Sequence, residues 1–156
     1  MDRSWRSLRF VVVSALFLAA GIFSEEVWAE EDYRITNEVV LSDVRVPPAK
    51  AGGWTRITFL LENRSAERVS FGGIAVAHAG QSRIVASLGN GSTTILGSIS
   101  VAPGEVLSVD GEVLWIEVDG LTEDLRPGEE VEANVSFGTA AIPISLTVEE
   151  RNRVSN

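Results

Sequence analysis

Apolar and polar residues alternate along most of the chain beyond residue 30. The clearest case is Trp54–Asn63, in which Ile57, Phe59 and Leu61 fall on one side of the alternation. Successive side chains of a β-strand point to opposite faces of a sheet, so this pattern predicts a strand with one buried face. Val131–Phe137 repeats the pattern, and no stretch of useful length beyond residue 30 shows the period of a helix.

Turn signals divide the alternating segments at short intervals. Proline lacks the amide donor that sheet pairing needs, and Asn-Gly and Asp-Gly tolerate the positive φ of tight turns. The signals occur at Pro47-Pro48, Asn90-Gly91, Pro103-Gly104, Asp110-Gly111 and Pro127-Gly128. The sequence therefore predicts an all-β fold, an antiparallel sandwich or barrel of about eight or nine short strands, one of which is Thr93–Val101.

The segment Val101–Leu121 carries the most informative polar face. Its last strand places three aliphatic residues on one side, and Trp115 and Glu117 on the other. An aromatic residue at such a position either packs under a neighbouring loop, which is the commoner arrangement, or marks a surface that docks a protein partner. The same two interpretations apply to Trp54.

Residues 1–29 have the features of a secretory signal peptide. Three arginines precede an uncharged run from Phe10 to Phe23, and Val27 and Ala29 occupy the −3 and −1 positions of a cleavage site. The run is shorter than the about 20 residues of a membrane-spanning helix, which argues against an uncleaved anchor. We expect cleavage after Ala29, a single domain over residues 30–156, and a periplasmic or secreted protein that leaves the membrane.

The chain is acidic and contains no cysteine. Its 13 Lys and Arg against 22 Asp and Glu give a formal net charge of −9. Such a surface repels nucleic acid and anionic lipid, so we expect neither as a partner. Without disulfides, the fold depends on its hydrophobic core alone.

The residues do not assemble a catalytic set. His78 is the one histidine, and the sequence has none of the motifs of serine hydrolases, zinc proteases or phosphate-binding loops. His78 lies among small residues, a context more typical of a structural histidine than of a general base. The acidic residues around Asp110–Asp124 lack the spacing of a calcium loop and fit a solvated face better. We predict a protein that is not an enzyme and has no catalytic or cofactor-binding residues.

Four motifs occur in an order and spacing that resemble one exported family. They are Asp43–Lys50 (DVRVPPAK), Ile57–Asn63 (ITFLLEN), Val101–Val106 (VAPGEV) and the spaced Gly, Leu, Val and Phe residues of Gly120–Phe137. Together they resemble the periplasmic copper chaperones of the PCuAC type, also described as a domain of unknown function. The resemblance covers nearly all of residues 30–156. It implies a cupredoxin-like, immunoglobulin-like β-sandwich that binds Cu(I) through His and Met.

The resemblance does not extend to the copper ligands. It places the family's first His at about Val85, its first Met within Thr93–Leu96, and its His-x-Met pair on Trp115 and Glu117. Cu(I) is a soft ion that selects thioether, thiolate or imidazole ligands, whereas carboxylates suit hard ions. The chain has one methionine, at position 1, and its one histidine lies upstream of the expected position. We therefore predict degenerate copper ligands, with copper as a cofactor only by resemblance.

Three functions remain open on the sequence. The first is an exported, non-catalytic binding or accessory module that docks a protein partner through the face of Trp115 and Glu117. The second is a periplasmic metal-handling protein, in which His78 with Glu117, or His78 from two copies, binds Cu(II) or Zn²⁺ modestly. The third is a structural subunit of the envelope or of an assembly. His78 and Glu117 are the metal-ligand candidates, and both are weak.

Overall fold

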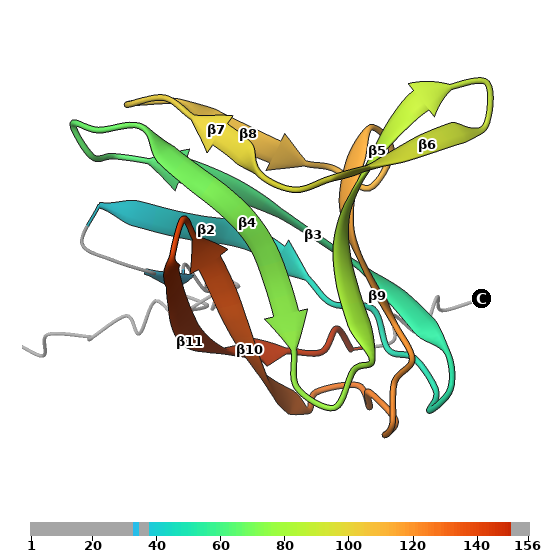
Figure 1. The fold of residues 1–156 in the computed structure, drawn as a ribbon. Helices are drawn as coiled ribbons and strands as arrows, with labels where there is room; N and C mark the ends of the chain where they lie inside the picture. The colour runs from blue at the N-terminus through green and yellow to red at the C-terminus, as the bar shows by residue number, and fades with distance from the viewer. Residues whose placement is uncertain (1–32, 35–37, 151–156) are drawn as a thin grey trace, which may run out of the picture.

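The computed structural model describes residues 33–34 and 38–150 of the chain. These residues form eleven β-strands in two antiparallel sheets (Figure 1). The expected signal peptide and its cleavage site after Ala29 lie outside the described residues, so export stays a prediction. The described part of the chain contains no helix with the length and apolar character needed to cross a membrane.

The larger sheet has seven strands and contains every predicted copper-ligand position. Its main path runs β1-β2-β3-β9-β5-β6, and β8 pairs with the C-terminal half of β3 where β9 pairs with the N-terminal half. The strands are β1 (Tyr33–Arg34), β2 (Val39–Arg45), β3 (Trp54–Asn63), β5 (Gln81–Gly89), β6 (Ser92–Leu96), β8 (Val106–Val109) and β9 (Leu114–Asp119).

The smaller sheet has four strands in the order β11-β10-β4-β7. They are β4 (Val69–Val76), β7 (Ile99–Val101), β10 (Glu130–Phe137) and β11 (Ala140–Thr147). The segment predicted as one strand, Thr93–Val101, is in fact two strands in different sheets, because the chain leaves the larger sheet after β6 and enters the smaller one at β7. The predicted all-β sandwich is confirmed. The structure has more strands than the eight or nine expected, because Thr93–Val101 forms two strands and because the short β1 was not predicted.

The hydrophobic core lies between the two sheets. Phe71 of β4 packs against Phe59 of β3 and Phe137 of β10, with ring centroids 5.6 Å and 6.0 Å away. Leu61 and Ile116 of the larger sheet are fully buried beside them. Burial of each such side chain contributes about 1.5–3 kcal/mol. The inward positions of β3 and β10 are those that the alternation predicted.

Asn63, at the end of β3, links the two sheets. Its buried side chain donates through Nδ2 to the carbonyls of Glu67 at 2.8 Å and of Val101, on β7, at 3.1 Å. Its Oδ1 accepts from the backbone N–H and the hydroxyl of Ser65. A buried amide is tolerated when its donors and acceptor are satisfied, as they are here. Asn63 thereby fixes the β3–β4 turn against β7.

Candidate functional site

The predicted ligand positions meet on the face of the larger sheet that points away from the core. Val85 of β5 pairs directly with Trp115 of β9 on one side and with Ile95 of β6 on the other. Glu117 follows Trp115 on the same face of β9, because residues two apart in a strand share a face. Directly paired residues have Cβ atoms about 4.5–5.5 Å apart, so these side chains are neighbours. Within the range Thr93–Leu96, Ile95 is the residue that pairs with Val85.

Trp115 is buried on this outward face, with only 5% of its surface exposed. The guanidinium of Arg56, on β3, lies over its ring with Cζ 4.2 Å from the centroid, a cation–π arrangement. Nη1 of Arg56 also donates to the carbonyl of Gly111 at 3.1 Å, which holds the β8–β9 loop to the same arginine. Of the two interpretations of Trp115, the structure therefore shows the packed one.

Asp110 shapes the loop that leads into β9. Its Oδ1 accepts hydrogen bonds from the backbone N–H groups of Val113 and Glu112, both at 2.8 Å, and of Leu114 at 3.3 Å. These bonds favour the ionised carboxylate, so they hold the pKa of Asp110 below its ordinary value. The Asp110-Gly111 turn signal thus corresponds to a fixed loop, whose Gly111 carbonyl is available to Arg56.

Glu117 is engaged by an arginine. Nη2 of Arg83 lies 2.8 Å from Oε1 of Glu117, and the same guanidinium contacts Asp119. Among the described residues, the Nε atoms of Arg56 and Arg83 and Nε1 of Trp115 are buried without a hydrogen-bond partner. The donors present are thus guanidinium and indole N–H groups and the acceptors are paired carboxylates, a set that offers a soft cation no ligand.

Exposed apolar side chains surround this packed centre. Trp54 is 57% exposed, with the centroid of its ring 5.5 Å from Cζ of Arg56. Ile95 and Val113 are each 61% exposed. We call the surface formed by Trp54, Val85, Ile95, Val113 and Trp115 the Trp115 face. The accessible aromatic residue of this face is Trp54, whereas Trp115 is buried. The alternation of the sequence did not distinguish these two tryptophans.

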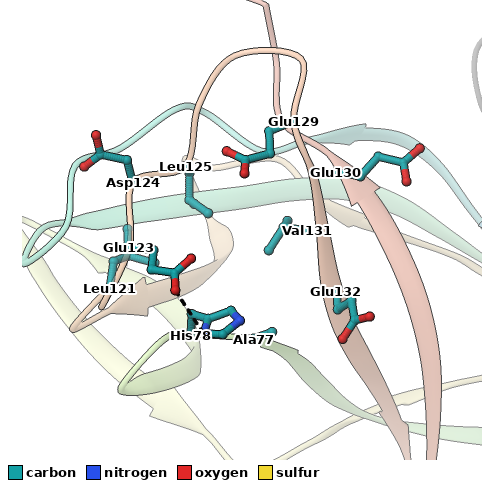
Figure 2. Close-up of a pocket in the computed structure, with 10 residues that line it drawn as sticks. All are labelled: Ala77, His78, Leu121, Glu123, Asp124, Leu125, Glu129, Glu130, Val131 and Glu132. Carbon is teal, nitrogen blue, oxygen red and sulfur yellow. Dashed lines mark ion pairs between the residues drawn. The ribbon is translucent and has the colours of Figure 1, made fainter.

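His78 lies apart from the Trp115 face, in the turn between β4 and β5. Its Nδ1 is 3.7 Å from Oε1 of Glu123, and the two side chains lie next to each other in the wall of a pocket with acidic and apolar lining (Figure 2). The pocket is lined by Ala77, His78, Leu121, Glu123, Asp124, Leu125, Glu129, Glu130, Val131 and Glu132. Glu117 does not line it. The two weak metal candidates therefore have different partners, Glu123 for His78 and Arg83 for Glu117.

The backbone of His78 supports the adjacent turn. Its φ of 59° is in the left-handed region, which is uncommon outside glycine. The carbonyl of His78 accepts hydrogen bonds from the N–H of Thr122 at 2.7 Å and from its hydroxyl at 3.0 Å. Within residues 33–34 and 38–150, no three or more His, Asp or Glu side chains form a group that could hold a metal ion.

Comparison with known proteins identifies the fold. No family model and no curated sequence matches the chain. The copper-bound PCuAC domain from PmoF2 superimposes with a TM-score of 0.64 at 13% identity, covering 78% of this chain and 99% of that domain. The apo PmoF2 PCuAC domain gives 0.62 at 13% identity, covering 78% and 97%.

The apo PCuAC domain from PmoF1 agrees, with a TM-score of 0.61 at 12% identity, covering 78% of this chain and all of that domain (100%). At identities this low, the superpositions establish the fold and say nothing about function. The resemblance drawn from the sequence motifs is confirmed at this level, because the superpositions cover nearly the whole of the PCuAC domains of PmoF2 and PmoF1. The chain has the PCuAC fold.

Proposed function

We propose that this protein is an exported, non-catalytic binding or accessory module built on the PCuAC fold, which has lost the Cu(I) site of that fold. The observation that carries the proposal is the convergence of Val85, Ile95, Trp115 and Glu117 on one face. The strand pairing brings together three positions where the resemblance places copper ligands and one residue of the range Thr93–Leu96, and neither these positions nor that range contain sulfur or imidazole.

The donor set argues against Cu(I) as cargo on chemical grounds. Cu(I) selects thioether, thiolate or imidazole ligands. An indole and two aliphatic side chains offer no lone pair to a metal, and the carboxylate of Glu117 is compensated by Arg83 at 2.8 Å. Replacing soft ligands by apolar groups removes the site and leaves a packed surface with Trp115 at its centre.

The Trp115 face has the composition of a surface that docks a protein. Aromatic and arginine side chains dominate binding energy at protein interfaces, and a packed centre beneath an exposed rim is typical of such surfaces. Here Trp54 is accessible, and Trp115 is held beneath Arg56. The partner on this proposal contacts Trp54 and the exposed Ile95 and Val113 while the packed centre stays in place.

A competition titration tests the proposal. The purified protein is titrated anaerobically with Cu(I) against a chromogenic chelator, and separately with Cu(II) and Zn²⁺. We expect the chelator to retain Cu(I). Stoichiometric transfer of Cu(I) to the protein would overturn the proposal.

A second candidate function, modest binding of Cu(II) or Zn²⁺, has one observation in its favour. His78 and Glu123 lie 3.7 Å apart in the pocket of Figure 2, which Glu129, Glu130 and Glu132 also line. Imidazole and carboxylate suit these ions better than they suit Cu(I). Binding that His78→Ala abolishes and Glu117→Gln leaves intact would support this function at the pocket. Absence of binding would exclude the function, and binding that neither variant alters would exclude His78 as a ligand.

A further inference from the structure

The strand β6 forms an open edge of the larger sheet. Among the described residues it pairs with β5 alone, and it ends the path β1-β2-β3-β9-β5-β6. Figure 1 shows the β5–β6 hairpin extending beyond the body of the sandwich. On the side away from β5, every second residue of β6 presents its N–H and C=O outward, as any edge strand does. Such an edge is a template for pairing with another chain.

The other sheet edges carry features that discourage pairing. β11 contains Pro143, which has no amide to donate, and β7 has only three residues. At the other end of the larger sheet, β1 has only two residues, and beyond it β2 has a register shift between Ser42 and Arg45, where Arg45 is paired with Asp43. β8 has four residues and lies between Glu105 and Asp110. Prolines, bulges, charges and short strands are the known protections of natural edges.

β6 has none of these protections. No Asp, Glu, Lys or Arg occurs from Ile84 to Gly104, and Ser92–Leu96 contains no proline. The one irregularity of the hairpin is the extra residue Leu88, which lies on β5 and not on the edge strand. Leu88 is 66% exposed and Ile95 61% exposed. The hairpin thus combines an open edge, apolar side chains and no charge, within a chain whose net charge is −9.

We propose that β6 pairs antiparallel with β6 of a second copy of this chain, about a two-fold axis. Two copies that each carry a charge of −9 repel one another, so their contact forms where charge is absent. A basic partner would instead be drawn to the acidic surfaces elsewhere. Full overlap of the five-residue strand with itself places Thr94 opposite Thr94 of the second copy, and Thr93 opposite its Ile95.

This pairing joins the two larger sheets into one continuous sheet. Ile95 is an outward residue, paired with Val85, so the Trp115 faces of the two copies then lie on the same side of the joined sheet. Each Ile95 gains a cross-strand neighbour from the other copy. The inference does not depend on the proposed function, because it concerns the free edge of β6 and would stand if the protein bound Cu(I).

Sedimentation velocity over a concentration series tests the pairing with a matched pair of variants. Ile95→Lys puts a charge on the edge, and Val106→Lys puts the same charge on β8, where Val106 is 53% exposed. We expect a concentration-dependent dimer for the wild-type protein and for Val106→Lys. For Ile95→Lys we expect the dissociation constant of the dimer to rise by roughly tenfold or more. A wild-type protein that stays monomeric up to about 1 mM would overturn the proposal, as would equal dimerisation of the two variants.

Cysteine cross-linking tests the register and does not rely on a disruptive variant. The chain contains no cysteine, so Thr94→Cys introduces a single thiol. Directly opposed residues have Cα atoms about 4.5–5.5 Å apart, which a disulfide can span. We expect rapid covalent dimers of Thr94→Cys under mild oxidation and little dimer for Val106→Cys. Equal cross-linking of the two variants would contradict the two-fold pairing of β6.

Discussion

The packing of Arg56 on Trp115 gives the sharpest energetic prediction. Arg56→Met keeps most of the apolar stem but removes the charge over the ring and the hydrogen bond to the Gly111 carbonyl. The cation–π contact is worth about 0.5–2 kcal/mol and the hydrogen bond about 1 kcal/mol. We expect Arg56→Met to lower the free energy of unfolding by about 1.5–3 kcal/mol. Trp115→Leu should lower it by roughly 2–3 kcal/mol, less than the about 3–5 kcal/mol of truncation to alanine.

The two substitutions should not be additive. If the guanidinium acts on the ring, the double variant should be less destabilised than the sum of the single variants by about 0.5–2 kcal/mol. Trp54 is the matched control, because its ring centroid is also near Arg56, at 5.5 Å, but its side chain is 57% exposed. The coupling between Arg56→Met and Trp54→Leu should be smaller, about 0.5 kcal/mol, the lower end of the range for exposed pairs.

Urea unfolding followed by circular dichroism measures all of these variants, since it does not depend on the tryptophans that are replaced. The midpoint and slope of each transition give the free energy of unfolding. A coupling between Arg56 and Trp115 indistinguishable from zero would refute the reasoning. A coupling as large for Trp54 as for Trp115 would show that burial of the contact is not what gives it strength.

Three further predictions concern the fold, the pH response and the proposed docking surface, the Trp115 face. Asn63→Ala should lower the free energy of unfolding by about 2–4 kcal/mol in urea titrations, because it leaves the carbonyl of Val101 without its buried donor; a loss under about 1 kcal/mol would refute the link between the sheets. The pKa of Asp110 in the folded protein is lowered from its ordinary value of 3.8. The stability that the ionised carboxylate contributes is therefore fully present at a pH above 3.8 and is lost as the pH falls through the lowered pKa. The advantage of the wild-type protein over Asp110→Asn at about pH 7 should therefore shrink towards about pH 2, and an advantage constant with pH would contradict this. Trp54→Ala should abolish recovery of a partner from extracts of the source cells while changing the free energy of unfolding by less than about 1 kcal/mol. The control Val106→Ala should change neither. Loss of the partner with both variants would argue against docking at the Trp115 face.

Local pattern was enough to predict most of the strands and the face of β9 on which Trp115 and Glu117 lie. The alternation in Val131–Phe137 predicted β10 to within one residue, because a half-buried strand imposes a period of two on its sequence. The division of Thr93–Val101 was not predicted, because the choice of sheet for each half depends on partners distant in the chain, β5 for one and β4 for the other.

The burial of Trp115 was equally beyond local pattern. Alternation assigned Trp115 to the polar side of its strand, and that side is correct. What covers it is Arg56, which reaches it only because β3 pairs with β9. The same pairing leaves Trp54 exposed. Sequence alone treated the two tryptophans alike, since their difference arises from contacts between strands and not within them.

The proposed loss of the Cu(I) site is tested most directly by adding Cu(I) to the isotopically labelled protein under anaerobic conditions and following its amide resonances by NMR. We predict no saturating shift at Val85, Ile95, Trp115 or Glu117 after one equivalent. Shifts that saturate at one equivalent and centre on these four residues would show that the PCuAC scaffold still binds copper there, and would contradict the account.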